Sequence, residues 1–401
     1  MSAENKLKIK DKIAQEKKHW VRLTRVCNNN CLFCLDKDSQ NGTVTPFSQI
    51  VKDLKKGYQE GASRAILSGG DPTLHPRLLE IIKKAKMIGY QHIQLITNGR
   101  MLAYENFTRG LKQAGLDEIT LSLHSHLRKP FEEMTQVKGS YLQSMRGLQN
   151  ALNYRFIVSI DIVINKINLG TLKDTLKFFI KFGVTEFDLL HPIPFGNAWR
   201  NKDKIFYSVA KAKKYLDKAF ELSKNRDLFI WTNRLPAVFL EGHEELIQHP
   251  IKLKDEIKNR EKGLKNYLKI GQPLFCFGGR CSYCFLEEFC QDLIELKNKG
   301  KLFSKLPPRC LVAKNRTVQT KPKTFWLAKN FNLDKFTDFY IKHRYFVKSL
   351  RCRRCQFYNQ CDGAQIDEIR AKGFGILKQR PLKNLLACHC ERPKGARQTR
   401  V

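Results

Sequence analysis

The chain has 401 residues, of which 42% are hydrophobic and 10% aromatic, a composition typical of a folded globular protein rather than a disordered or fibrous one. Lysine and arginine number 73 against 38 acidic residues, so the formal net charge is +35. No apolar run of about 18 residues is present, and the charged start MSAENKLKIKDKIAQEKKHW lacks an apolar signal segment. We therefore expect a cytoplasmic protein without membrane association, built from one large domain and one or two smaller ones.

Between residues 19 and 235, extended apolar runs alternate with helical patterns. Each run is followed by a stretch with apolar residues at helical spacing and, in several cases, a glycine near its end. The runs cover 20–26, 64–70, 92–99, 118–124, 156–165 and 186–194. Six such units in series predict a parallel sheet with right-handed crossovers, so we expect an α/β fold, a partial (β/α)6 barrel of the TIM type.

Four polar residues of the later runs, His124, Asp161, Asp188 and His191, are candidates for lining the barrel. Barrel strands are buried on both faces, so the alternation of residue types does not show which of the four face inward.

Three cysteines, Cys27, Cys31 and Cys34, lie just beyond the first predicted strand, at the end of the barrel where such folds place their chemistry. Three closely spaced thiolates can hold three corners of an iron–sulfur cubane, whose full set of protein ligands would be four cysteines. The remaining position is then open to a substrate or cofactor. A zinc site with a distant fourth ligand is the alternative, but no nearby residue completes it.

The other ten cysteines all lie beyond residue 275, mostly in tight groups. An odd total of 13, in a large chain without an export signal, favours metal binding over disulfides. CFGGRCSYCFLEEFC holds four, and CRRCQFYNQCDG repeats its C-x2-C-x5-C part with three more. Four thiolates close a site, which suits electron transfer or structural support, with zinc as the alternative to a cluster. These predicted ligands are Cys276, Cys281, Cys284 and Cys290, then Cys310, then Cys352, Cys355 and Cys361, with Cys388 or Cys390 able to complete the last group.

Taken together, the motifs resemble those of the radical S-adenosylmethionine (radical SAM) superfamily. The CxxxCxxC pattern of residues 27–34, with Phe33 before the last cysteine, is similar to the signature of that family. The motifs similar to its later strand ends follow in the family's order: SGGDPTLHP (68–76), TNG (97–99), Ser122 in TLSLH, VINKIN with Asn165 and Asn168, and PIPFG (192–196).

The resemblance implies a [4Fe–4S] cluster that binds S-adenosylmethionine at its open iron and cleaves it to a 5′-deoxyadenosyl radical, which abstracts hydrogen from a substrate. It also implies an electron donor such as flavodoxin or ferredoxin. Asp71 stands where the family usually carries glutamate. The residues expected to contact the cofactor are Gly69, Gly70, Asp71, Pro72, Thr97, Asn98, Ser122 and Asn165.

The C-terminal cysteines resemble the SPASM or twitch type of extension, which implies one or two auxiliary [4Fe–4S] clusters. Gln365 stands where that pattern usually has another cysteine. We expect a basic N-terminal segment (1–18), the barrel (19–235), a bridging segment with the first auxiliary cysteine group (236–295), and a SPASM-like domain with a basic tail (296–401).

Two segments leave alternatives open. Residues 296–333 hold ten basic residues and no acid, with aromatics at and beyond Trp326, which suits either an RNA-binding surface or the core of a small lysine-rich domain. Residues 233–263 include Glu241, His243, Glu244 and Glu245, for which we expect a bridging helix with a solvated acidic face. The alternative is a segment that gates the barrel and uses His243 as a proton donor.

Three functions fit these observations. The first is a radical SAM enzyme acting on a peptide or protein side chain, as many relatives with a SPASM extension do. The second keeps this chemistry but modifies tRNA or rRNA. The third is a non-catalytic iron–sulfur or zinc protein that binds nucleic acid, which the strand-end motifs disfavour.

Overall fold

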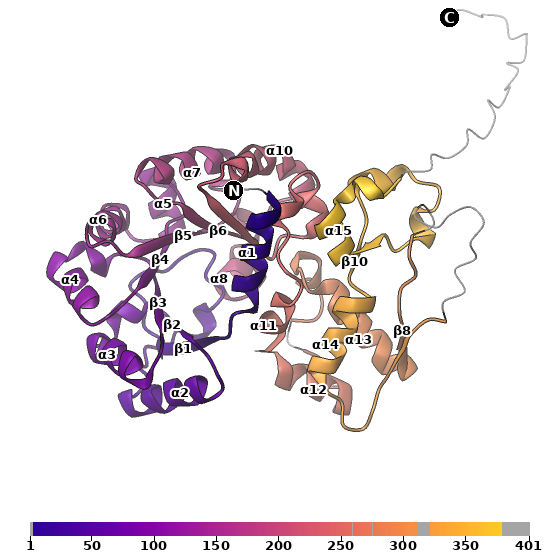
Figure 1. Ribbon diagram of the computed structural model, residues 1–401, viewed down its shortest axis with the longest axis horizontal. Helices are drawn as coiled ribbons and strands as arrows, with labels where there is room; N and C mark the ends of the chain where they lie inside the picture. The colour runs from indigo at the N-terminus through magenta and orange to yellow at the C-terminus, as the bar shows by residue number, and fades with distance from the viewer. Residues whose placement is uncertain (1–2, 259, 275, 309, 311–320, 379–401) are drawn as a thin grey trace, which may run out of the picture.

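The computed structural model describes residues 3–258, 260–274, 276–308, 310 and 321–378. Within these residues, the larger domain is built on a sheet of seven parallel strands in the order β1-β2-β3-β4-β5-β6-β7 (Figure 1). The strands are β1 (Lys18–Thr24), β2 (Arg64–Gly69), β3 (His92–Thr97), β4 (Glu118–Ser122), β5 (Ile157–Val163), β6 (Glu186–Leu190) and β7 (Phe229–Asn233).

The predicted α/β architecture is confirmed, since all six expected strands are present and parallel. The seventh strand, β7, was not predicted, because its five residues follow a charged turn and give no long apolar run. It lies at the edge of the sheet beside β6.

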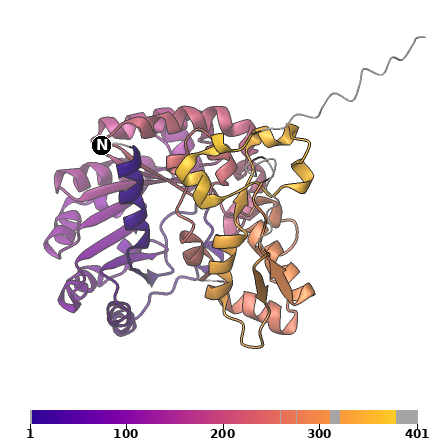
Figure 2. The ribbon, with the colours of Figure 1, turned by 45° about the vertical axis from the view of Figure 1, so that its right-hand side comes forward.

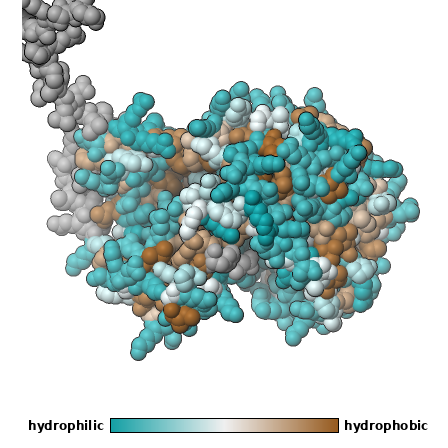
Figure 3. All heavy atoms as spheres, turned by 180° about the vertical axis from the view of Figure 1, so that it is seen from behind, coloured by the Kyte–Doolittle hydropathy of each residue, from teal (hydrophilic) through white to brown (hydrophobic). Residues whose placement is uncertain are grey.

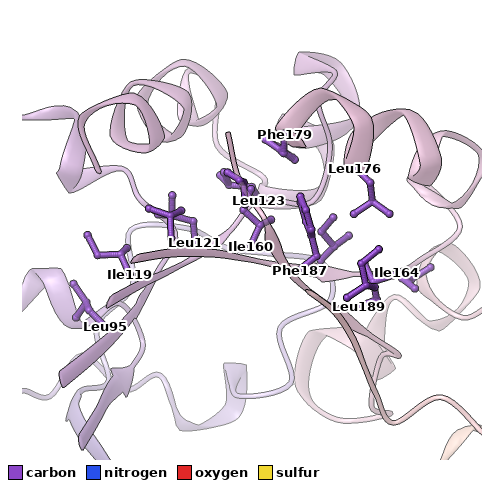
Figure 4. Packing of buried hydrophobic residues seen from close by; sticks show 14 of the residues in the cluster. Leu95, Ile119, Leu121, Leu123, Ile160, Ile164, Leu176, Phe179, Phe187 and Leu189 are labelled. Atoms are coloured by element: carbon purple, nitrogen blue, oxygen red, sulfur yellow. The ribbon is translucent and has the colours of Figure 1, made fainter. Parts of the chain in front are cut away.

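Helices cover the outer face of this sheet and fill the connections. They are α2 (Phe47–Gln59), α3 (Leu78–Ile88), α4 (Glu105–Gln113), α5 (Arg128–Thr135), α6 (Ser140–Asn153), α7 (Leu172–Lys181), α8 (Gly196–Arg200), α9 (Lys202–Ile205) and α10 (Val209–Phe220). Figure 4 shows the packing between strands and helices, with Leu95, Leu121 and Phe187 from the sheet and Leu176 and Phe179 from α7. Alternate residues of each strand enter this core, and burying each one fully contributes roughly 1.5–3 kcal/mol.

The opposite face of the sheet is the concave inside of the barrel, and it is largely polar. In β5 and β6, Ile160, Phe187 and Leu189 belong to the outer core, whereas Asp161 and Asp188 line an internal cavity. Of the four candidate residues, Asp161 and Asp188 therefore face the inside of the barrel.

The open side of the barrel is covered by the N-terminal helix α1 (Ala3–Gln15), which Figure 1 shows in indigo between the sheet and the C-terminal domain. Lys10 of α1 donates a 2.5 Å hydrogen bond to the carbonyl of Ile230 in β7. Asp11 forms an ion pair with Arg370 of the C-terminal domain. The basic N-terminal segment therefore packs against both domains.

The C-terminal domain is helical around a second core, with two small two-stranded antiparallel sheets (Figure 2). Aromatic residues fill this core, and the rings of Phe289 and Phe336 lie 5.3 Å apart. Its elements are α11 (Lys252–Lys258), α12 (Glu261–Ile270), α13 (Glu287–Lys299), β8 (Lys301–Phe303), β9 (Thr324–Trp326), α14 (Leu333–His343), β10 (Phe346–Val347), β11 (Ala364–Gln365) and α15 (Ile366–Lys372).

The basic region does not display its aromatic residues as a nucleic-acid platform would. Phe336 and Phe346 are buried, and Phe331 and Tyr345 pack against the core, whereas Trp326 is 64% exposed. Hydrophilic side chains dominate the molecular face in Figure 3, with only small apolar patches. Of the two alternatives for this region, the described residues favour the core of a small basic domain.

The acidic residues Glu241, Glu244 and Glu245 contact other parts of the protein instead of lying on a helix that faces solvent, so that prediction was wrong for them. They lie at or between two short 3-10 turns, Ala237–Leu240 and Glu244–Leu246, and the helix of the segment, α11, begins only at Lys252. The Glu241 carboxylate accepts hydrogen bonds from Ser349 Oγ (2.8 Å) and the Leu350 amide (3.0 Å). His243 is 4% exposed and packs against Phe220 of α10, which gives no support to the gating alternative.

None of the described helices has the length and apolar character needed to cross a membrane.

Candidate functional site

Cys27, Cys31 and Cys34 lie on the loop that follows β1, at the C-terminal edge of the sheet. Residues 97–99 and 69–71 end the neighbouring strands at the same edge, because parallel strands bring their carboxyl ends together. The three cysteine side chains are partly buried and close enough to influence one another's ionisation.

Neighbouring thiols and burial make these cysteines hard to ionise in the absence of a metal. Desolvation raises the pKa of Cys27 to about 11, and the nearby Asp71 carboxylate adds to this effect. Burial, reinforced by Cys27 and Cys34, also raises the pKa of Cys31. A cationic iron centre would reverse this balance, since a metal stabilises the thiolate form. Three soft donors on one loop therefore fit an iron–sulfur cluster with an open iron.

The asparagines between the cysteines connect this loop to the end of β3. The Asn28 side-chain oxygen accepts a 2.6 Å hydrogen bond from Asn98 Nδ2. Arg100 donates to Asn29 Oδ1 at 3.0 Å and to the Asn28 carbonyl. Asn28 and Asn29 thus link the cluster loop to the TNGR segment, which explains these two polar residues in a partly buried position.

Two further elements hold the second half of the loop. The Leu32 amide donates to the carbonyl of Met134, at the end of α5, over 2.9 Å. Asn197, in α8, donates from its backbone to the Cys34 carbonyl (2.9 Å) and from its side chain to the Cys31 carbonyl (3.0 Å). Gly196 is required beside it, because its φ is +52° and a Cβ would lie 2.5 Å from the Cys34 carbonyl oxygen.

The GGDP motif packs directly against the end of β1. A Cβ on Gly70 would lie 2.0 Å from the Val26 carbonyl oxygen, and one on Gly69 would lie 2.4 Å from that of Thr24. Gly70 donates its amide to the Thr24 carbonyl at 2.9 Å, and Asp71 donates its amide to the Val26 carbonyl at 2.7 Å. The glycines therefore allow a close approach of two backbones beside Cys27.

Asp71 is 1% exposed, and its carboxylate is hydrogen-bonded within the protein instead of facing an open site. It accepts hydrogen bonds from the Thr97 hydroxyl (2.8 Å), the Asn98 amide (3.0 Å) and both the amide (3.0 Å) and the hydroxyl of Thr73. Pro72, also buried, begins the short 3-10 turn that Asp71 caps. These donors occupy most of the carboxylate's acceptor positions, so Asp71 orders the ends of β2 and β3.

The side chain of Asn165 is likewise hydrogen-bonded within the protein. It is fully buried, its Nδ2 donates to the Val163 carbonyl (2.9 Å), and its Oδ1 accepts from the Ile167 amide (3.0 Å). Asn168 caps the same turn by accepting from the Asn165 amide at 2.8 Å. Ser122, in contrast, is only partly buried at the last position of β4. The cofactor contacts expected for these residues stay predictions.

The two candidate histidines are neutral and structural. Burial lowers the pKa of His124 to about 3, and its Nδ1 accepts from the Val163 amide at 3.2 Å. Its ring lies 4.4 Å from that of Phe33, between Cys31 and Cys34, so it closes one side of the cluster loop. His191 pairs with the Tyr207 hydroxyl at 3.0 Å, and burial lowers its pKa to about 4.

The described cysteines of the C-terminal domain form two groups of four. In the first group, Cys281 Sγ donates to the Cys276 carbonyl at 3.7 Å. Burial and the neighbouring thiols of Cys284, Cys276 and Cys281 raise the pKa of Cys290 to about 12. All four residues of this group thus lie within electrostatic range of one another.

The second group consists of Cys310, Cys352, Cys355 and Cys361, which together line a cavity of about 20 Å³. Cys310 therefore provides a fourth thiol for this group, while Cys388 and Cys390 lie outside the described residues. Gln365, which stands where a further cysteine was considered, has a structural role. Its side chain accepts hydrogen bonds from the amides of Asp367 and Glu368 and caps α15.

No three His, Cys, Asp or Glu side chains of the described part lie in the arrangement that a single metal ion needs. Each thiolate ligand of a cubane binds a different iron atom, so the ligands of a cluster stand farther apart than those of one ion.

Arg100 and Asn197 were not singled out from the sequence. Arg100 directly follows the TNG motif and Asn197 follows PIPFG, and this adjacency is the signal that could have found them. Their contacts with the cysteine loop cross 72 and 166 positions of the chain, so only the fold brings them there.

The comparison with protein families agrees with the three-cysteine loop described above. Residues 21–179 match the model of the Radical SAM superfamily. Proteins named "Probable GTP 3',8-cyclase" are 32% identical in Sulfurisphaera tokodaii and 35% identical in Metallosphaera sedula, over 46% and 44% of this chain. The matches span only 60% and 57% of the length of these relatives.

Among solved structures, Streptococcus suis SuiB bound to S-adenosylmethionine aligns with 92% of this chain and 77% of its own, at 14% identity and a TM-score of 0.48. The family match places residues 21–179 of the chain in the Radical SAM superfamily.

Proposed function

We propose that this protein is a radical SAM enzyme whose cluster is held by Cys27, Cys31 and Cys34. The observation that carries the proposal is the meeting of this three-cysteine loop with the GGDP and TNG segments at one edge of the sheet. A non-catalytic iron–sulfur protein would have no need for these strand-end segments. When bound, a [4Fe–4S] cluster at these thiolates supplies the electron that cleaves S-adenosylmethionine to methionine and a 5′-deoxyadenosyl radical.

The residues around the loop have positioning roles in this proposal. Asp71 fixes Thr97 and Asn98, and Asn98 in turn holds Asn28 between the first two cysteines. Phe33 and His124 shield the loop with apolar ring surface. Backbone groups at Gly69 and Gly70, together with Ser122, remain the candidates for direct contact with S-adenosylmethionine.

The two groups of four cysteines in the C-terminal domain are proposed to hold auxiliary [4Fe–4S] clusters. Their closed ligand sets suit electron transfer or structural support rather than ligand activation. Reduction by flavodoxin or ferredoxin, and a cytoplasmic location, stay predictions.

For the substrate we propose a peptide or protein side chain, in keeping with the SPASM-like cysteine groups. The burial of Phe336 and Phe346 weakens the alternative of an RNA substrate. A second candidate is a nucleotide, since the curated relatives are named as probable GTP 3',8-cyclases. Their names describe proteins that this chain matches over less than two thirds of their length.

The test is anaerobic reconstitution with iron and sulfide, followed by reduction with dithionite and quantification of 5′-deoxyadenosine. We expect wild-type protein to form 5′-deoxyadenosine and Cys31→Ala to form none. Retained cleavage in Cys31→Ala would contradict the assignment of the open cluster. Adding GTP in a parallel reaction and searching for a cyclised product tests the second candidate.

A further inference from the structure

One row of residues crosses the inner face of the barrel, starting from Ser122, a predicted cofactor contact. Ser122 of β4 pairs in register with Asp161 of β5, Asp161 with Asp188 of β6, and Asp188 with Trp231 of β7. Register partners on adjacent strands point to the same face of a sheet. The two carboxylates are therefore neighbours, one strand away from the serine at the end of β4.

Both aspartates and Trp231 line an internal cavity of about 400 Å³. This volume lies within the range of small-molecule sites, roughly 300–1,000 Å³. The α1 helix closes one wall, where Lys10 lies 5.3 Å from the centre of the Trp231 ring and donates to the Ile230 carbonyl. A buried ammonium is thus already tolerated in the wall of this cavity.

The aspartate pair is incompletely satisfied. Asp188 Oδ2 accepts a 2.5 Å hydrogen bond from Asn233 Nδ2, but within the described residues its buried Oδ1 has no hydrogen-bond partner. Burial raises the pKa of Asp188 to about 6, and burial together with the charge of Asp188 raises that of Asp161. A buried polar atom without a partner is uncommon in folded proteins, and the cavity gives room for a water molecule or a ligand to supply one.

The cations around the pair already have acidic partners of their own. Arg234 forms an ion pair with Glu256 at 2.8 Å, and Lys252 forms one with Asp255 at 3.2 Å. Deeper in the barrel, Arg64 binds Glu118 at 2.7 Å. Two neighbouring carboxylates in a cavity repel each other, and a bound cation would remove both this repulsion and the unsatisfied acceptor.

We propose that the cavity is the inner end of the substrate site and that Asp161 and Asp188 bind an organic cation, an ammonium or guanidinium group of the substrate. This rests on the proposed radical SAM function, because the neighbouring Ser122 is what relates the cavity to S-adenosylmethionine. The inference favours a substrate such as a lysine or arginine side chain. A triphosphate would be repelled from this row of the barrel by two carboxylates.

Equilibrium binding tests the proposal without turnover. The probe is N-acetyl-lysine methylamide, titrated by calorimetry into the full-length reconstituted protein in the presence of S-adenosylmethionine. Its uncharged counterpart, N-acetyl-norleucine methylamide, has nearly the same side-chain shape. We expect the cationic probe to bind wild-type protein at least about tenfold more tightly than the neutral probe. Equal binding of the two probes, or no binding of the cationic one, would overturn the proposal.

Two near-isosteric variants test whether the preference for the cationic probe comes from Asp161 and Asp188. Asp188→Asn and Asp161→Asn are each expected to weaken the cationic probe by about tenfold or more and to leave the neutral probe unchanged. Asp174→Asn, in the first turn of α7, is the matched control and should bind as wild type does. Circular dichroism verifies that each variant is folded. Unchanged affinity in both variants would contradict the assignment.

The outcome is separable from that of the proposed function. Failure of wild-type protein to form 5′-deoxyadenosine would refute the radical SAM activity, whereas loss of charge selectivity in the titration would refute only the cation site.

Discussion

Asn98, at the end of β3, donates a 2.6 Å hydrogen bond from its side-chain amide to Oδ1 of Asn28, between the first two cysteines of the β1 loop. The same Asn98 donates its backbone amide to the buried Asp71 carboxylate after β2. One residue therefore joins the ends of three consecutive strands around the proposed cluster. This arrangement positions the loop through contacts that are made by the protein alone.

The Asn28–Asn98 contact should contribute measurably to stability. In a double-mutant cycle with Asn28→Ala and Asn98→Ala, we expect a coupling free energy of about 1 kcal/mol, as for a partly buried side-chain hydrogen bond. Urea unfolding of the metal-free protein, followed by circular dichroism, measures it. Asn106→Ala in α4 is the control and should change the free energy of unfolding by less than about 0.5 kcal/mol. Strictly additive effects of the two substitutions would refute the contact.

Gly70→Ala should disrupt the site by sterics alone. Its Cβ would lie 2.0 Å from the Val26 carbonyl oxygen, so either the GGDP segment or the end of β1 must move. We expect a loss of roughly 2 kcal/mol or more in unfolding free energy and a fall in 5′-deoxyadenosine formation.

Gly170→Ala is the matched control, because a Cβ there meets nothing within 4 Å and its φ is not in the left-handed region. Wild-type stability in Gly70→Ala would show that the two backbones are not in contact.

Iron content should separate the three cysteine groups. With all of them loaded with [4Fe–4S] clusters, reconstituted protein should contain about twelve irons, and Cys31→Ala and Cys355→Ala should each lose about four. Elemental analysis with sulfide quantification provides the measurement. Ser282→Ala, between Cys281 and Cys284, is expected to retain the wild-type content. Zinc in place of iron in the wild-type C-terminal domain would argue against auxiliary clusters.

The aspartate pair that lines the cavity should make stability depend on pH. Arg234, Lys252 and Glu256 face Asp188, and Glu118 faces Asp161, yet burial dominates and raises the pKa of Asp188 from its usual 3.8 to about 6. A raised pKa means that the folded state binds the proton more tightly, so this group lowers stability as the pH rises from about 4 through 6.

Asp188→Asn removes this titration. We expect the variant to gain stability relative to wild type as the pH rises from 4 to 7, by up to about 2 kcal/mol. Urea unfolding of both proteins across this range measures the difference, with Asp174→Asn as the control. A gap between variant and wild type that stays constant with pH would show that Asp188 does not titrate in this window.

Much of the barrel could be predicted from the sequence because hydrophobic periodicity is a local property. Runs such as HIQLIT and EITLSLH identify strands through their own residue types, and the CxxxCxxC spacing identifies the donor set without knowledge of the fold. Strand β7 was not predicted from the sequence, because it is short and follows a charged turn. The acidic segment was misjudged for the converse reason, since Glu241 looks solvated until the partner that covers it, Ser349, is known.

The sequence by itself determined the alternation of strands and helices, the three-cysteine loop after β1 and the two later cysteine groups, since spacing along the chain suffices for each. Only the tertiary structure decided that Asp161 and Asp188 face inward as neighbours, that Asp71 and Asn165 are occupied within the fold, and that Cys310 joins the second group of four. These relationships arise between segments far apart in the chain. They depend on strand register and domain packing, which fix the partners that each polar group meets.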